Sequence, residues 1–437
     1  MTRVDSISPG SPEIRLTRLD SGIRVVTEAM PALRSASVGF WVGTGSRDEP
    51  PELSGASHFL EHMLFKGTER RSAIEIAEAV ESVGGDMNAF TSHEMTTYYV
   101  RIPDGCLELA TDILSDIVWS PSIRGDELDA ERQVILEEIG MRDDTPEDLV
   151  HDVFSNALFS GHPLGREVIG TPETIGAMDR TSLLAFHGAH YHPSNVVVAA
   201  AGNLHHDEVV ELVQQGLARD AGARPDRLPF GGATAPEPMV VLERPTEQAH
   251  VVLGTRSLAR DDPDRYALNV LDQVLGGGMA SRLFQEIREK RGLAYSVYSF
   301  RAAYEETGAL AVYAGTSPDR VGDVVSLVEA ELARIVADRG VSDAEMASAK
   351  GNLTGSLALG LETSSSRMHR VGRALLTLGT VPPLDEVVAA VEQVTPDDLA
   401  RVVDRVLGDA SRTVAAVGPF SALDLPRAAA SNGAGSD

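Results

Sequence analysis

The chain has one cysteine, three lysines and no long apolar run. Cys106 has no second cysteine with which to form an internal disulfide. The longest apolar runs, such as residues 196–201, fall far short of the roughly 18 residues that a membrane span needs. Residues 1–15 show neither the apolar segment of a secretory signal nor the arginine-rich pattern of a transit peptide. We therefore expect a soluble, reduced, cytoplasmic protein.

Basic residues are also fewer than acidic ones. The 38 Lys and Arg side chains face 65 Asp and Glu side chains, which gives a formal net charge of -27. A strongly negative chain is repelled by phosphate backbones and by anionic lipid surfaces. Nucleic acid and membranes are therefore not expected as partners.

The remaining composition is that of a globular protein with two domains. Hydrophobic residues make up 43% and charged residues 24% of 437 positions. Glycine and proline are concentrated between residues 220 and 238, which indicates an extended connection. We predict a first domain over residues 1–222, a linker over 223–238, a second domain over 239–426 and a disordered tail over 427–437.

The order of predicted elements is similar in the two halves. In each half a β-rich run is followed by a helix, a second strand, further helices and a short apolar strand ending in glycine. The matching segments are 37–44 and 250–255, 97–102 and 309–314, 126–141 and 343–359, and 196–202 and 413–418. Solenoid repeats are much shorter than this. The pattern predicts an α+β fold of two homologous α/β-sandwich domains, each a mixed sheet packed with helices.

The strongest chemical signal is the segment 55–68, which contains His58, Glu61 and His62. On a helix, two histidines four residues apart project from one face, close enough to share a metal ion. Glu61 lies on nearly the same face, within reach of a metal-bound water. A catalytic zinc site needs a third protein ligand from elsewhere in the chain.

The candidate third ligand lies on an acidic helix over residues 131–138. Glu131 and Glu138 are two turns apart and share a face, whereas Glu137 points about 100° away. Periodicity alone does not choose between Glu131 and Glu138.

The H-x-x-E-H segment and the later acidic helix together resemble the inverzincin metallopeptidases, the family of pitrilysin, insulysin and the mitochondrial processing peptidase. The resemblance covers most of the chain and is to the short, single-chain bacterial type. In that family the third ligand lies some 76 residues beyond the second histidine, which selects Glu138. The resemblance thus implies one Zn²⁺ held by His58, His62 and Glu138, with Glu61 as general base and Glu131 orienting a ligand histidine.

Three further stretches resemble parts of that family. Residues 84–91 resemble its strand beside the metal, an edge on which an extended peptide can add as a strand, which implies substrate binding by Asn88, Ala89, Phe90 and Thr91. Residues 288–295 resemble its Arg and Tyr pair, which implies that Arg288 and Tyr295 stabilise the oxyanion. Gly276, Gly277 and Gly278 resemble a substrate-contacting loop but equally fit a helix C-terminal cap.

The repeat provides an internal control on the metal assignment. Aligned with the first half, the second half has Ala267, Val270 and Leu271 at the positions of the H-x-x-E-H residues. Ala349 and Ser356 take the positions of Glu131 and Glu138. We therefore expect the first domain to be catalytic and the second to be an inactive homologue that closes the cleft.

The resemblance implies a zinc metalloendopeptidase that hydrolyses unfolded oligopeptides or small proteins inside an enclosed chamber. A chamber in that family needs four such domains, so a homodimer or pairing with a related chain is implied. Two alternatives remain open at this stage. One is a processing peptidase that removes basic presequences, and the other is a non-catalytic scaffold subunit.

Overall fold

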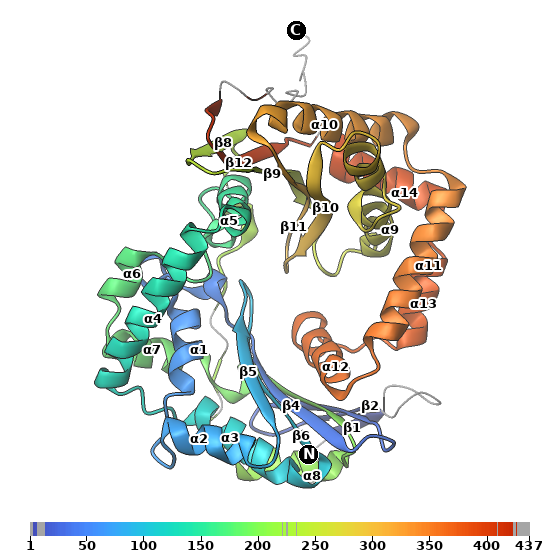
Figure 1. Ribbon diagram of the computed structural model, residues 1–437. Helices are drawn as coiled ribbons and strands as arrows, with labels where there is room; N and C mark the ends of the chain where they lie inside the picture. Colours follow the sequence, from blue (N-terminus) through green and yellow to red (C-terminus); the bar gives the residue numbers. More distant parts are fainter. Residues whose placement is uncertain are drawn as a thin grey trace. The chain divides into compact units, whose positions relative to one another are not determined.

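The computed structural model describes residues 3–6, 14–220, 222–223, 226–232, 234–408, 410–422 and 425. These residues form two compact units, each built around one mixed β-sheet (Figure 1). The first unit takes in the chain as far as Ile139, then Glu167–Leu228 and Ala358–Pro383. The second takes in Gly140–Arg166, Pro229–Leu357 and the chain from Leu384 onward. Both units layer helices on a mixed sheet, which confirms the predicted α+β class.

The first unit contains a seven-stranded sheet. Its strands, in spatial order, are β1 (Arg3–Ser6), β2 (Ile14–Arg18), β3 (Arg24–Ala29), β7 (Val196–Gly202), β4 (Ser35–Val42), β6 (Thr96–Pro103) and β5 (Asp86–Thr91). Neighbouring strands run antiparallel except β3 and β7, which are parallel. Strand β7 is buried along its whole length, as expected for an apolar strand covered on both faces. Strand β5 is the last strand in this order and is an edge strand of the sheet.

Helices cover both faces of this sheet. They are α1 (Ala56–Leu64), α2 (Ala73–Glu81), α3 (Leu107–Trp119), α4 (Gly125–Asp143, as far as Ile139), α6 (Pro172–Ala177), α7 (Arg180–His190), α8 (His206–Gln215) and α12 (Ser364–Leu378). Helices α3 and α8 lie on one face, and α12 lies on the other (Figure 1). Helix α1 contacts β5 and β6, so the H-x-x-E-H motif lies beside the edge strand.

The second unit repeats this sheet with five strands. In spatial order they are β10 (Ala294–Ala303), β11 (Gly308–Thr316), β9 (Ala249–Ser257), β12 (Thr413–Gly418) and β8 (Met239–Glu243). Only β12 and β8 run parallel. The order and directions match β5, β6, β4, β7 and β3 of the first unit one for one. The internal repeat predicted from the sequence is therefore present in the fold.

The helices of the second unit are packed on both faces of its sheet. They are α5 (Pro146–Leu158), α9 (Arg265–Gly276), α10 (Val321–Asp338), α11 (Asp343–Gly360, as far as Leu357), α13 (Leu384–Glu392) and α14 (Pro396–Val403), with π-helical segments at Phe284–Glu289 and Asp404–Gly408. Helices α9 and α10 lie on one face of the sheet, and α5 lies on the other. None of the described helices has an apolar stretch long enough to cross a lipid bilayer.

Each unit contains one helix from the opposite half of the sequence. Helix α12, from the second half, packs Met368, Val371 and Leu375 into a core with Trp41 on the first sheet. Helix α5, from the first half, packs against β9 and β12 through a core of its own. Each compact unit therefore takes in segments from both halves of the sequence. The apolar face of a helix shows that it is buried, but it does not identify the sheet that buries it.

The predicted boundaries themselves stay a prediction. One of the points at which the chain passes between the units, Leu228 to Pro229, lies inside the segment 223–238 expected to be a linker. The tail predicted over 427–437 lies outside the described residues.

Candidate metal centre

Helix α1 presents His58 and His62 from one face. It begins at Gly55, whose φ of 93° is a left-handed conformation that favours glycine, and it runs for nine residues. Its apolar residues Phe59, Leu60 and Met63 are buried in the core of the first unit. This packing fixes the rotation of the helix, and the two imidazole ring centroids lie 4.8 Å apart.

Helix α4 brings Glu138 to the same point. Its Oε2 lies 3.8 Å from Nε2 of His58 and 3.5 Å from Nε2 of His62. The ligand atoms of these three residues all lie within 4.8 Å of one another, and they are the one such group among the described residues. Glu138 lies between Ile135 and Ile139 in the sequence of α4, and these two buried residues anchor the helix.

The three side chains fit a zinc ion. Glu138 Oε2 is buried, and it has no hydrogen-bond partner in the described part of the chain. Its separations from the two imidazole nitrogens are too long for hydrogen bonds but suit ligands of one ion, since atoms ~2 Å from a tetrahedral zinc lie roughly 3–3.5 Å apart. Two imidazoles and a carboxylate are also a common catalytic zinc set.

The protonation of the histidines suits metal binding. Burial, with a smaller contribution from His62, lowers the pKa of His58 to about 4, so its imidazole is neutral at pH 7. His62 Nδ1 lies 3.0 Å from Glu131 Oε2, and an ionised carboxylate can only accept a hydrogen bond. In the neutral ring this contact holds the proton on Nδ1, and the lone pair is then on Nε2, which faces Glu138.

Glu131 is buried and doubly paired. Burial alone would raise its pKa, but hydrogen bonds from Lys66 and His62 outweigh that effect and lower it. Lys66 Nζ lies 2.6 Å from Glu131 Oε1, and the Glu131 residue is 6% exposed. The structure thus assigns different contacts to the two carboxylates that periodicity left open: Glu138 faces both Nε2 atoms, and Glu131 faces Nδ1 of His62.

Glu61 lies on the same helix without belonging to the ligand group. Burial raises the pKa of its carboxyl, while a hydrogen bond from Thr91 and the charge of His62 act in the opposite direction. Its Oε2 is buried and has no hydrogen-bond partner among the described residues. A carboxylate with a raised pKa and a free oxygen can accept a proton from a nearby water.

Strand β5 places the predicted substrate-binding residues on an open edge. Asn88 and Phe90 are exposed and pair in register with Tyr99 and Thr97 of β6. No strand of the described chain pairs with the other edge of β5. Thr91 Oγ1 lies 3.5 Å from the carbonyl of Ser57 on α1, so strand and motif helix are in contact.

Arg288 and Tyr295 lie together in the second unit. Arg288 belongs to the π-helical segment Phe284–Glu289, and its guanidinium carbon lies 5.5 Å from the ring centroid of Tyr295 and 4.7 Å from that of Phe284. Tyr295 is 82% exposed at the start of β10. Both side chains present hydrogen-bond donors, and their contact with substrate stays a prediction.

The glycine run has a structural explanation. Gly276 ends α9, and a Cβ there would lie 2.2 Å from the backbone nitrogen of Ser299 on β10. Gly277 is the C-terminal cap of the helix. Substrate contact by Gly276, Gly277 and Gly278 stays a prediction beside this role.

Among its described residues, the second unit has no counterpart of the metal ligands. Ala267, Val270 and Leu271 are buried core residues on α9, and Ala349 is buried on α11. Apolar packing thus takes the positions of His58, Glu61 and His62, whereas Ser356, at the position of Glu138, is exposed on α11.

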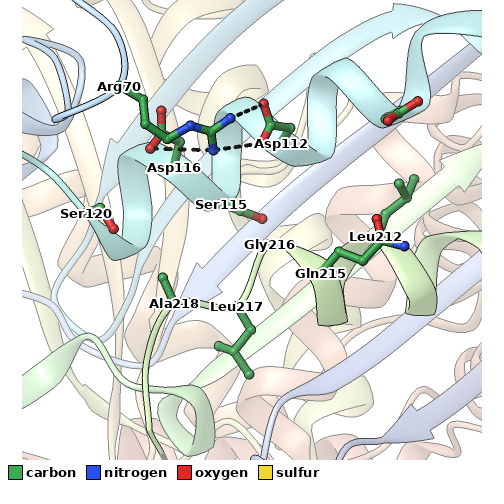
Figure 2. Close-up of a pocket in the computed structure, with 11 residues that line it drawn as sticks. Arg70, Asp112, Ser115, Asp116, Ser120, Leu212, Gln215, Gly216, Leu217 and Ala218 are labelled. Atoms are coloured by element: carbon green, nitrogen blue, oxygen red, sulfur yellow. Dashed lines mark hydrogen bonds and ion pairs between the residues drawn. The ribbon is translucent and has the colours of Figure 1, made fainter.

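A separate pocket of about 270 Å³ lies between α3 and α8 in the first unit (Figure 2). Arg70 lies on its α3 side, with two hydrogen bonds to Asp112 of 2.9 and 3.1 Å. Ser115 points toward Gly216, and a Cβ on Gly216 would lie 2.5 Å from Ser115 Oγ. None of the predicted catalytic residues lines it, and Arg70 is paired there with Asp112 and Asp116.

Sequence reasoning missed two residues at the metal centre. Lys66 pairs with Glu131 from just beyond the end of α1, and Glu49 binds the first turn of α1. Lys66 follows His62 by four residues, the spacing of a shared helix face, which is the one signal that could have found it. Glu49 has no such signal, because its contact depends on the path of an irregular loop.

Comparison with known proteins points to one family. Residues 24–172 match the family described as "Insulinase (Peptidase family M16)", and residues 177–353 match "Peptidase M16 inactive domain". A Streptomyces coelicolor protein named "uncharacterized zinc protease" is 46% identical over 91% of this chain and 88% of its own length. A Mycobacterium tuberculosis H37Rv protein of the same description is 47% identical over 92% and 93%, respectively.

Solved structures share the fold. A protease from Helicobacter pylori superposes with a TM-score of 0.86 at 24% identity, covering 96% of this chain and all of that one. A Pseudomonas fluorescens protein described as a peptidase M16 inactive domain superposes with a TM-score of 0.87 at 22% identity, over 94% and 98% of the two chains.

Proposed function

This chain belongs to peptidase family M16, the insulinase family, and we propose that it is a zinc-dependent endopeptidase that hydrolyses unfolded oligopeptides. The observation that carries the proposal is the convergence of His58, His62 and Glu138 beside the buried carboxyl of Glu61. Relatives at 46–47% identity that are named zinc proteases support it.

The ligand set would hold one zinc ion. When bound, zinc would supply a Lewis acid that polarises the scissile carbonyl and acidifies water. His58 and His62 offer neutral imidazole nitrogens, and Glu138 offers a carboxylate oxygen. Glu131 keeps the proton of His62 on Nδ1, so the ring is held in the binding orientation.

Glu61 would act as the general base. Its raised pKa makes the carboxylate a stronger base toward the attacking water, which favours proton transfer at neutral pH. It would then return that proton to the leaving amine. Thr91 ties Glu61 to the edge strand on which the substrate lies.

Substrate would add to β5 as a further strand. The free edge of β5 offers backbone N–H and C=O groups to an extended peptide, so backbone pairing would dominate recognition. An enclosed chamber around this edge would admit unfolded peptides and exclude folded domains. We therefore expect casein-like and short peptides to be cleaved, and a compact folded domain to resist; rapid degradation of a stable folded domain would contradict the proposal.

The deciding experiment compares the wild-type protein with Glu61→Gln. Both are stripped with a chelator, reloaded with zinc and assayed on a quenched fluorescent peptide mixture. We expect hydrolysis only by zinc-loaded wild type, with a loss of at least about 100-fold in Glu61→Gln and unchanged zinc content. Glu75→Gln, on α2 away from the metal centre, is the matched control and should remain active.

Other outcomes separate the alternatives. Cleavage of a basic leader peptide at one bond, with little general hydrolysis, would favour presequence processing. Folded, zinc-loaded wild type with no activity would favour a scaffold subunit or a chain that needs a partner. Sedimentation of the purified protein tests the proposed homodimer, and Arg288→Ala and Tyr295→Phe test the predicted oxyanion donors.

A further inference from the structure

A buried carboxylate binds the first turn of the motif helix. Glu49 is 3% exposed, and its two oxygens accept hydrogen bonds from the backbone N–H groups of Gly55 and Ser57, each at 2.7 Å. These groups belong to the start of α1, where the first N–H groups of any helix lack partners within the helix. The cap residue of α1 is Gly55, which has no side chain with which to satisfy them. Glu49 therefore takes the place of a side-chain cap.

The charge of Glu49 suits its location. A helix N-terminus carries partial positive charge, and a carboxylate that accepts backbone N–H bonds there forms charge-assisted hydrogen bonds. Because each oxygen binds a different N–H group, the carboxylate fixes both the position and the direction of the first turn. His58 follows Ser57 directly, and Glu61 and His62 follow one turn later.

The backbone around this joint has little room to shift. A Cβ on Gly55 would lie 2.8 Å from the carbonyl oxygen of Ile169, so the segment just before α6 closes over the start of α1. Pro50 and Pro51 separate Glu49 from the helix and restrict the loop that carries it. If the Glu49 carboxylate were displaced, a small shift of the chain could therefore not restore its two hydrogen bonds.

The segment before Glu49 is attached to the turn that follows the edge strand. The N–H groups of Ser46 and Arg47 donate to the carbonyls of Ser92 and His93 at 3.1 and 2.8 Å. The guanidinium of Arg47 donates to Glu94 at 2.6 Å, and both residues are buried. Residues 46–49 thus connect the β5–β6 turn at one end with the motif helix at the other.

From these contacts we infer that Glu49 is a positioning residue of the metal centre. It holds the first turn of α1 in place relative to β5, and through that turn it sets His58 and Glu61. Glutamine at this position would keep one acceptor oxygen and turn an NH₂ group toward a backbone N–H. One of the two contacts would then become repulsive.

The test is Glu49→Gln against Glu75→Gln. Glu75 also binds the start of a helix, through the backbone N–H and hydroxyl of Ser72 at 2.7 Å, but its helix α2 carries no metal ligand. Zinc affinity of the stripped proteins is measured by competition with a chromogenic chelator. We expect binding to weaken about 10-fold or more in Glu49→Gln and less than about 2-fold in Glu75→Gln.

A kinetic measurement separates positioning from general destabilisation. With zinc saturating and the fold confirmed by circular dichroism, Glu49→Gln should lower kcat about 10-fold while KM changes little. Glu49→Asp, which keeps the charge on a shorter side chain, should fall between wild type and Glu49→Gln in both measurements. Should Glu49→Gln not fold, the Glu49→Asp protein decides the question by the same two measurements.

Wild-type zinc affinity and kcat in a folded Glu49→Gln protein would overturn the inference, as would equal losses in Glu75→Gln. The kinetic measurement rests on the proposed function, whereas the zinc measurement does not. Failure of the wild type to hydrolyse peptides would therefore count against the function and leave the zinc comparison decisive for Glu49.

Discussion

His62 donates its Nδ1 hydrogen to Glu131, 3.0 Å away, and Glu131 receives a second bond from Lys66. The three residues form a chain from ammonium to carboxylate to imidazole, with the buried Glu131 at its centre. Its effect is to turn the unprotonated nitrogen of His62 toward Glu138 before any metal arrives.

Glu131→Gln is predicted to weaken zinc binding about 10- to 100-fold. The amide can still accept one hydrogen bond, but it loses the charge that pairs with Lys66 and favours the Nδ1 tautomer of His62. Chelator competition on the stripped protein measures the change. Glu137→Gln, an exposed neighbour on the same helix, should bind zinc as wild type does, and an equal loss there would argue for a general effect of charge.

Zinc is predicted to raise the melting temperature of the stripped protein. An ion that binds the folded state alone stabilises it by RT ln(1 + [Zn]/Kd), which is about 2.7 kcal/mol at a zinc concentration 100 times the Kd. Glu138→Gln should remove most of the shift because a ligand is lost. Differential scanning fluorimetry measures it, and a full shift in Glu138→Gln would remove Glu138 from the ligand set.

Gly372→Ala is predicted to destabilise the first unit by about 1–3 kcal/mol. A Cβ at Gly372 on α12 would lie 2.7–2.8 Å from ring atoms of Trp41, which is fully buried on β4. Urea denaturation measures the loss. Gly351→Ala on α11 is the control, because its Cβ would meet nothing within 4 Å, and it should be neutral or stabilising. Equal stability of both variants would show that α12 does not pack on β4 in solution.

Stability is predicted to fall as the pH drops from about 6.5 to about 4. Burial lowers the pKa of His206 to about 4, and the ring bonds Thr17 and Thr27 at 2.8 Å each. The unfolded chain takes up this proton near pH 6.5. Over that window the unfolded state binds more protons, so His206 alone removes up to about 1.4 kcal/mol per pH unit.

His206→Gln tests this pH dependence. The variant is less stable at pH 7, but its unfolding free energy should fall less steeply with acid. His205→Gln changes an exposed neighbour and should keep the wild-type slope. Identical slopes in all three proteins would assign the acid sensitivity to other groups.

Much of the fold could be predicted because it follows local patterns. The strand expected at 413–418 coincides with β12, and the helix expected at 126–141 is α4 with one or two more residues at each end. The repeat was visible because both halves keep the same order of apolar runs. The exchange of α5 and α12 could not be predicted, since an apolar helix face is compatible with either sheet.

The candidate site could be predicted as far as its chemistry depends on spacing. His58, Glu61 and His62 follow from the helical repeat, whereas Glu131 and Glu138 occupy the same face two turns apart and are separated only by their contacts. Glu49 could not be predicted. Its function depends on a loop that returns to the start of α1, and no periodicity describes that path.

The exchanged helices impose an order on biosynthesis. Ser364 of α12 bonds Ser37 of β4 across 327 residues of sequence. A ribosome must therefore translate past residue 378 before Trp41 and its neighbours on that face of the first sheet are covered. Until then the nascent chain exposes an apolar sheet face to the cell, a state that chaperones bind and that aggregates readily. A gene fragment that encodes only the zinc-ligating half should for this reason yield insoluble protein, however complete its metal ligands are.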